Sequence, residues 1–247
     1  MRTIRLDLAY DGTAFHGWQR QPRLRTVQGV LEAALETAIG EAVALTGAGR
    51  TDAGVHAHGQ VATFQSGTAL PARAIAPLLG RQLPVDVEVR AAHDTPQGFD
   101  ARRSATARRY SYRLLDHPDV LMARFAWHPR RSLDPSALAA AVAPLEGRHD
   151  CLAFQASGGT PRRTECAVHR AAWRRWEGGL LFEVVADHFL YHMVRNIVGT
   201  ALQAASAADP ARAMREVIAS RRRAHGGPTA PAQGLCLEQV FYPVEAT

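Results

Sequence analysis

The sequence contains no lysine, so all 29 of its basic residues are arginines. A guanidinium group can bind phosphate through two hydrogen bonds and can stack on nucleobases. The abundant alanine nevertheless favours codon bias in a GC-rich genome over selection for RNA binding as the cause. The missing lysine is therefore no evidence for a nucleic-acid partner by itself.

Cysteines and long apolar runs are also scarce. The three cysteines, Cys151, Cys166 and Cys236, lie far apart and form no CxxC pair of the kind that indicates zinc or redox chemistry. We interpret them as packed thiols in a reducing cytoplasm. No apolar stretch approaches the roughly 18 residues that a membrane span requires, and Asp7 interrupts the first apolar run. We expect a soluble, cytoplasmic protein that is not exported and has no membrane partner.

The sequence has an excess of basic residues and is long enough to form a folded domain. The 29 basic residues outnumber 23 acidic ones, which gives a net charge of +6 and a pI near 9.9. This excess favours a polyanionic partner such as nucleic acid. Clusters that could follow a phosphate backbone are Arg102-Arg103, Arg162-Arg163 and Arg221-Arg222-Arg223, although such runs are usually solvated surface. The 247 residues, 47% of them hydrophobic, suffice for one large domain or two ordinary ones.

Hydrophobic periodicity predicts an α+β fold in two halves, residues 1–104 and 105–247. Each half mixes strands with helices around a mainly antiparallel sheet. In the first half we expect strands at 2–10, 41–46, 55–64 and 85–92 and helices at 27–38, capped by Thr26 and Gly40, and 71–83. In the second half we expect strands at 108–115, 151–154, 163–175, 180–186 and 235–242 and helices at 134–145, 190–205 and 210–222.

The segment Gly47-Ala-Gly-Arg-Thr-Asp-Ala-Gly-Val-His56 places one acid, Asp52, among small residues. Asp52 could cap a turn, bind a metal together with His56 and His58, or act as a nucleophile. The glycines and alanines on both sides would let a bulky ligand come close to the carboxylate. A catalytic zinc site usually has three protein ligands, and the neighbouring Arg50 would oppose a metal ion. We therefore disfavour the metal hypothesis.

Two further residues are candidates for binding a substrate. Arg195 is a lone cation on an otherwise apolar helix, which indicates either a buried partner or a surface residue whose stem is covered. If its partner is Asp52, the ion pair would keep the carboxylate ionised and ready to attack. Tyr110 and Tyr112 share one face of a strand behind two arginines, which would suit RNA stacking, although packing within a sheet is the commoner role.

Five motifs follow one another along the chain. They are YDG with GWQRQ from Tyr10, AGRTDAGVH from Ala48, ATARRYSY from Ala105, FLYHMVRNIVG from Phe189 and GLCL from Gly234. With these motifs the chain resembles the tRNA pseudouridine synthase A family almost end to end, and the most specific of them is GRTDAGVH, which begins at Gly49. The resemblance implies two ferredoxin-like or RRM-like halves that share a mainly antiparallel sheet with a central RNA-binding cleft.

The resemblance also implies a function and a set of site residues. The family isomerises uridine to pseudouridine at positions 38, 39 and 40 of the tRNA anticodon arm, acts as a homodimer and needs no cofactor or metal. Matched to its motifs, Asp52 is the nucleophile, Tyr110 stacks on the uracil and Arg50 helps to flip the base out. Arg195 would pair with the aspartate, and Leu235 would pack against the uracil.

Two other functions compete with this one. A non-catalytic RNA-binding protein, such as a tRNA folding chaperone, would use the same basic surface without turnover, but an intact GRTD motif argues against it. A metal-dependent hydrolase built on Asp52, His56 and His58 would lose its activity in chelator.

Overall fold

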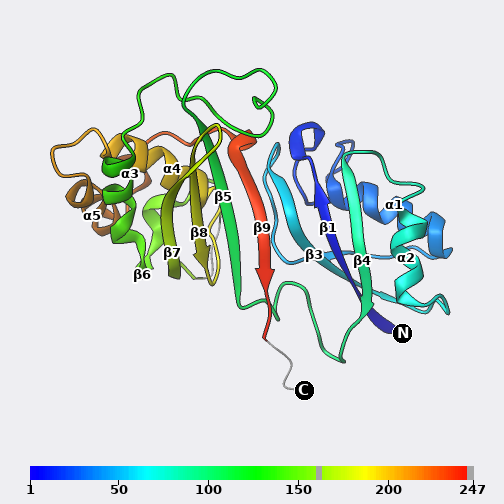
Figure 1. Ribbon diagram of the computed structural model, residues 1–247. Helices are drawn as coiled ribbons and strands as arrows, with labels where there is room; N and C mark the ends of the chain where they lie inside the picture. Colours follow the sequence, from blue (N-terminus) through cyan, green and yellow to red (C-terminus); the bar gives the residue numbers. More distant parts are fainter. Residues whose placement is uncertain (160–162, 244–247) are drawn as a thin grey trace. The chain divides into compact units, whose positions relative to one another are not determined.

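The computed structural model describes residues 1–159 and 163–243 and divides into two compact units (Figure 1). Unit 1 comprises Met1–Thr106 and the chain from Leu237 onward, and unit 2 comprises Ala107–Cys236. The last strand therefore belongs largely to unit 1, although it follows unit 2 in sequence. Each unit combines helices with antiparallel strand pairs, which confirms the predicted α+β class.

Unit 1 is built on a sheet with the strand order β4-β1-β3-β9, and β2 pairs with β3. The pairs of β1 with β3 and with β4 are antiparallel. Ile4, Leu6 and Leu8 of β1 are buried, as their alternation predicts. The strands are β1 (Arg2–Tyr10), β2 (Thr46–Gly47), β3 (His56–Ser66), β4 (Val87–Asp94) and β9 (Leu235–Phe241).

Helices α1 (Val27–Ile39) and α2 (Ala72–Leu79) cover one face of the unit 1 sheet (Figure 1). Both ends of α1 have the caps that the sequence predicts. The Thr26 side chain accepts a hydrogen bond from the Gly29 backbone N–H, and Gly40 takes a left-handed φ of 74° after the last turn.

The strand predicted at residues 41–46 is mostly absent, because only β2 pairs with β3 there. Side chains of α1 bond to the backbone of Leu45 instead of a neighbouring strand. Glu32 Oε1 accepts from Leu45 N at 3.0 Å, and Gln28 Nε2 donates to Leu45 O at 3.2 Å. Since these side chains satisfy the Leu45 backbone groups, the segment has no need of a ladder.

Unit 2 repeats the plan with the strand order β5-β8-β7-β6, again antiparallel. Pro135 lies at the first turn of α3, as expected, and Asp134 caps that helix. The strands are β5 (Ala107–Leu115), β6 (Gly147–Asp150), β7 (Glu165–Trp176) and β8 (Gly179–Ala186). The helices are α3 (Pro135–Val142), α4 (Met193–Ala204) and α5 (Pro210–Ser220).

The strand predicted near Cys151–Phe154 is wrong: these residues form a short 3-10 helix, and β6 ends just before it. The Asp150 carboxylate accepts a hydrogen bond from the Leu152 backbone N–H at 3.1 Å. An aspartate that bonds two residues ahead turns the chain and so competes with strand extension.

The structure bears on the predictions made for the cysteines and for membrane spans. Cys151, Cys166 and Cys236 are free thiols, and all three are buried. In the part of the chain that the structure describes, no helix is both long and apolar enough to cross a bilayer.

Candidate active site

Asp52 lies in the loop between β2 and β3 of unit 1, and its side chain is neither fully buried nor fully exposed. The loop turns tightly, because the Asp52 carbonyl accepts a hydrogen bond from Val55 N at 3.2 Å. Gly54 takes a φ of 78°, in a region that residues with a Cβ rarely adopt, and its N–H donates to Phe15 O at 3.2 Å. The motif thus encodes a fixed turn immediately after the acid.

The segment that contains the GWQRQ motif packs against this loop. Trp18 N donates to the Thr51 carbonyl at 3.0 Å. A Cβ added to Gly17 would lie 2.7 Å from the same carbonyl oxygen, closer than carbon can approach. Two motifs that lie about 30 residues apart in the sequence therefore build one structure around the residue that precedes Asp52.

A chain of side-chain hydrogen bonds supports the loop from beneath. The Tyr10 hydroxyl lies 2.8 Å from Thr51 Oγ1, and Gln60 Nε2 lies 3.3 Å from the Tyr10 oxygen. Gln60 Nε2 also donates to the Gly49 carbonyl at 2.8 Å. Sequence reasoning assigned no role to Gln60, although a polar residue two positions before Ala62 and four before Phe64 departs from the apolar pattern of that strand face.

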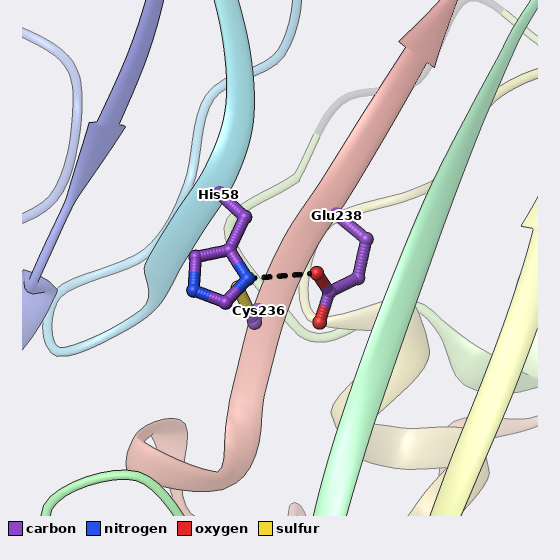
Figure 2. Close-up of side chains that lie close together, drawn as sticks. All are labelled: His58, Cys236 and Glu238. Atoms are coloured by element: carbon purple, nitrogen blue, oxygen red, sulfur yellow. Dashed lines mark hydrogen bonds and ion pairs between the residues drawn. The ribbon is translucent and has the colours of Figure 1, made fainter.

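The two histidines of the motif have different neighbours. His56 is buried, and its Nδ1 lies 3.1 Å from Gly12 N and 3.2 Å from Asp11 Oδ1. Figure 2 shows the His58 ring facing the Glu238 carboxylate, with Nδ1 3.0 Å from Oε2. His58 is exposed and on β3, and Glu238 is on β9.

The metal site proposed from Asp52, His56 and His58 is not assembled in unit 1. Among residues 1–159 and 163–243, neither Asp52 nor His56 belongs to a group of three potential ligands whose atoms lie close together. A catalytic zinc needs three protein ligands around one point. The metal-dependent hydrolase thus loses the ligand set on which it rested.

In unit 2, Tyr110 and Tyr112 lie on the same face of β5, opposite Val184 and Phe182 of β8. Tyr110 is 8% exposed, and its ring packs in a T-shaped arrangement with the Phe189 ring, with centroids 5.0 Å apart and planes at 79°. Phe189 therefore fixes the orientation of the Tyr110 ring, which a stacking residue requires.

Tyr112 has a structural role that the shared face alone does not reveal. Its ring is fully buried, and its hydroxyl donates to the Pro231 carbonyl at 2.7 Å. Burial raises the pKa of this hydroxyl far above its ordinary value and outweighs the opposing effect of the Arg195 cation. The hydroxyl stays protonated and keeps holding the chain before Leu235, which is itself buried at the start of β9.

Arg195 is half-buried on α4 and holds the same segment from another side. Its Nε donates to the Ala230 carbonyl at 2.8 Å, and Ala230 N donates back to the Arg195 carbonyl at 3.2 Å. The guanidinium therefore has a specific protein partner and is more than a covered surface cation. Its predicted pairing with Asp52 joins residues of different units and stays a prediction.

Asn196, the next residue on α4, is an unpredicted centre of hydrogen bonding and is completely buried. Its Nδ2 donates to Phe154 O at 2.7 Å, and its Oδ1 accepts from Thr229 Oγ1 at 2.6 Å and from Arg223 Nη2 at 3.1 Å. Burial lowers the pKa of the Arg223 guanidinium, which nevertheless remains charged at neutral pH. The bond from Thr229 holds the loop at residues 226–231 on α4.

The arginine clusters are partly occupied by acids of their own unit. At least one member of each forms an ion pair: Arg103 with Asp100 at 3.4 Å, Arg163 with Asp187 at 3.0 Å and Arg221 with Asp150 at 2.6 Å. Arg162 lies outside the described residues. Ion pairs near the surface contribute little to stability.

The predicted site residues are thus divided between the two units. Asp52 and the exposed Arg50 share one loop of unit 1, whereas Tyr110, Arg195 and Leu235 all belong to unit 2. Within unit 2, Tyr112 and Arg195 bond to the two residues Pro231 and Ala230, four and five positions before Leu235.

Comparisons with known proteins give a consistent result. A family model described as tRNA pseudouridine synthase matches residues 8–102 and 141–243. A tRNA pseudouridine synthase A from Moorella thermoacetica is 41% identical over 246 residues, covering 98% of this chain and 100% of its own. Proteins of the same name from Myxococcus xanthus and Geobacter sp. are each 41% identical, over 98% of this chain and 92% and 100% of theirs.

Proposed function

This chain belongs to the tRNA pseudouridine synthase family, and from that membership we propose how its residues divide the work. It is an isomerase that converts uridine to pseudouridine in tRNA. The observation that carries the finer proposal is Asp52, a carboxylate in a tightly fixed loop within the GRTDAGVH motif.

The reaction needs neither a group donor nor an oxidant. The bond between N1 of the uracil and C1′ of the ribose breaks, the uracil rotates, and a bond forms between C5 and C1′. The hydrogen on C5 leaves as a proton, and N1 gains one. The substrate and the product have the same composition, so protein side chains can perform every step.

Asp52 acts as the nucleophile in our proposal. A carboxylate can trap the cationic sugar at C1′ once the glycosidic bond weakens, in the way that retaining glycosidases do, or it can add to the uracil ring. Both routes require the oxygen to stay in one place. The bonds from Trp18 and Tyr10 to the adjacent Thr51 support that requirement.

The target uridine must leave its stack, at a cost of a few kcal/mol. We assign the recovery of that cost to two residues. Tyr110, whose ring is oriented by Phe189, stacks on the flipped uracil, and the exposed Arg50 enters the space that the base leaves. Leu235 packs against the uracil, and Arg195 pairs with the Asp52 carboxylate. These four roles rest on the match to the family motifs.

The substrate and the assembly are also proposals. We propose that the modified uridines lie at positions 38, 39 and 40 of the anticodon stem-loop, that the active species is a cytoplasmic homodimer and that tRNA is held by both protomers. The net charge of +6 supports a polyanionic substrate.

Mapping pseudouridine in tRNA transcripts tests the site proposal. A transcript with uridines at 38, 39 and 40 should gain pseudouridine there, and one with cytidines at these three positions should gain none. Modification that persists in the second transcript at another position would show a different specificity while leaving the reaction class intact.

The competing function, a tRNA chaperone without turnover, predicts binding alone. Incubation of purified protein with tRNA labelled with tritium at C5 of uridine separates the two, because only isomerisation displaces the C5 hydrogen into water.

A further inference from the structure

Gln60 is a polar residue on the buried face of β3, which it shares with the apolar residues Ala62 and Phe64. It lies on β3 opposite Leu8 of β1, two residues before Ala62, which pairs with Leu6. Its exposed fraction is 0%. Burying an amide is unfavourable unless every donor and acceptor finds a partner, so such a residue is retained for what it binds.

The amide of Gln60 is fully satisfied, and two of its three bonds lead to the Asp52 loop. Nε2 donates to the Gly49 carbonyl at 2.8 Å and to the Tyr10 hydroxyl oxygen at 3.3 Å. Oε1 accepts from Val61 N at 3.1 Å. With the amide reversed, an oxygen would face the Gly49 carbonyl, so only this orientation fits the contacts.

The Tyr10 hydroxyl passes the restraint on to the residue beside Asp52. Because it accepts from Gln60, its own hydrogen is available to Thr51 Oγ1, 2.8 Å away. Gln60 therefore holds the loop at Gly49 directly and at Thr51 through Tyr10, on either side of Arg50. Tyr10 and Thr51 are themselves buried, so water does not compete for these bonds.

We propose that Gln60 is a positioning residue for catalysis: its side-chain amide fixes the loop that carries Asp52 and so sets where the carboxylate stands. This inference rests on the proposed role of Asp52. Gln60 itself touches neither substrate nor reacting atoms. A displacement of about 1 Å at a catalytic group can cost about 100-fold in rate.

Gln60→Glu tests the donor specifically, because it keeps the size and shape of the side chain. In its protonated form the introduced carboxyl can still donate to Gly49 O, whereas in its ionised form it has only acceptors facing a carbonyl. Burial raises the pKa of a carboxyl. The kcat of Gln60→Glu should therefore fall steeply as pH rises, by about 10- to 100-fold relative to wild type at the alkaline end, and recover as pH falls. The KM for tRNA should stay within about threefold, because the loss is in placing the carboxylate.

Gln65→Glu is the matched control, since Gln65 lies on the same strand and is exposed. Its pH profile should follow that of wild type. Gln60→Leu, which removes the donor at every pH, should show the low kcat throughout, with circular dichroism and tRNA affinity reporting whether the fold is kept.

The outcomes separate this inference from the proposed function. If Gln60→Glu has the pH profile and kcat of wild type while Asp52→Asn is inactive, the positioning role is wrong and the nucleophile stands. An active Asp52→Asn would instead remove the proposed function on which the inference rests. A Gln60→Glu that unfolds as pH rises, with binding and kcat lost together, would make Gln60 a stability residue and would also overturn the proposal.

Discussion

The nucleophilic role proposed for Asp52 requires both access to the carboxylate and a fixed position, and different neighbours of Asp52 provide the two. Access comes from small residues, since Ala53 and Gly54 follow it directly. Position comes from backbone bonds made by its neighbours, above all Trp18 N to the Thr51 carbonyl. The side chain of Asp52 is thus placed by the loop, and substitutions that keep the loop should affect chemistry more than binding.

The proposed stacking role of Tyr110 predicts a defined loss of activity when the ring is removed. Tyr110→Leu keeps an apolar side chain of moderate size but removes the aromatic face, and stacking of one base is worth about 1–3 kcal/mol. We expect kcat/KM to fall by about 5- to 150-fold. Single-turnover kinetics with a tRNA transcript measure it. Tyr110→Phe keeps the ring and should lose less, and equal losses in the two variants would contradict a stacking role.

Loss of the Tyr112 hydroxyl should destabilise the fold. Tyr112→Phe removes the hydrogen bond to the partly buried Pro231 carbonyl and leaves that oxygen without its donor, which costs about 1–3 kcal/mol. The midpoint of urea unfolding should fall accordingly. Since the same segment leads to Leu235, activity should fall as well. An unchanged midpoint would mean that another donor replaces the hydroxyl.

At the scale of elements, α4 organises unit 2 because the loop at residues 226–231 lies directly on it. A Cβ added to Gly199 would lie 1.7 Å from the Pro228 carbonyl oxygen, and one added to Gly227 would lie 2.3 Å from the Gly199 oxygen. The two backbones are in contact with no side chain between them. The FLYHMVRNIVG motif and residues 226–231 thus form one packed interface.

Gly199→Ala tests this close approach. The added methyl group must displace the Pro228 carbonyl, and overpacking of this kind costs about 1–3 kcal/mol. We expect a lower unfolding midpoint together with reduced turnover, since Arg195 bonds to the same loop. Gly80→Ala is the control, because its Cβ would have no neighbour nearer than 3.6 Å. Equal stability of the two variants would contradict the packing.

The lowered pKa of Asp187, which directly follows β8, predicts that the stability of the fold decreases at acid pH. Burial raises the pKa of the Asp187 carboxyl, but the hydrogen bonds that it accepts from Ala167 N and from the His188 backbone and ring together lower the pKa by more, so the net shift is downward. A carboxyl with a lowered folded pKa stabilises above its unfolded value, about 3.9, and loses that contribution as pH falls through the folded pKa. Asp187→Asn should therefore reduce the difference in urea midpoint between about pH 5 and pH 2.

Glu177→Gln, an exposed carboxyl in the turn between β7 and β8, serves as the comparison for Asp187→Asn. Its acid dependence should match that of wild type. If Asp187→Asn retained the full acid dependence, the hydrogen bonds to this carboxylate would have no role in it.

Elements with local signals could be predicted from the sequence, and those defined by distant side chains could not. The helix at Val27–Ile39 was predicted with both caps, because Thr26 and Gly40 act within one turn. The strand predicted at residues 41–46 is mostly absent because Glu32 and Gln28, on that helix, bond to the Leu45 backbone. No local sequence pattern reveals these bonds.

The candidate site shows the same division. Asp52 and Tyr110 could be proposed as site residues from motif and alternation, since both signals depend on neighbours in sequence. Gln60 and Asn196 could not be assigned, because each acts on backbone groups 11 to 42 residues away. In a single sequence, a buried amide is visible only as a polar residue among the apolar residues of its strand face.

For the whole molecule, the basic charge predicts how binding responds to salt. Each phosphate neutralised by a guanidinium releases counterions, so the logarithm of tRNA affinity should fall linearly with the logarithm of salt concentration. The slope is about −0.7 to −0.9 per phosphate contacted. Fluorescence anisotropy with labelled tRNA at several salt concentrations measures it, and an affinity independent of salt would exclude phosphate contacts as its main source.

The proposed homodimer predicts a mass of twice the 26.8 kDa of the chain. Multi-angle light scattering at micromolar protein, with and without tRNA, gives that mass directly. A protein that is monomeric and fully active at the assay concentration would contradict the homodimer and leave the assignment of Asp52 intact.

The central claim is that the carboxylate of Asp52 performs the isomerisation, and Asp52→Asn tests it most directly because it changes one oxygen to nitrogen at constant size. Release of tritium from tRNA labelled at C5 of uridine should be undetectable with the variant, while its tRNA affinity stays close to wild type. Tritium release at the wild-type rate from the variant would contradict the account.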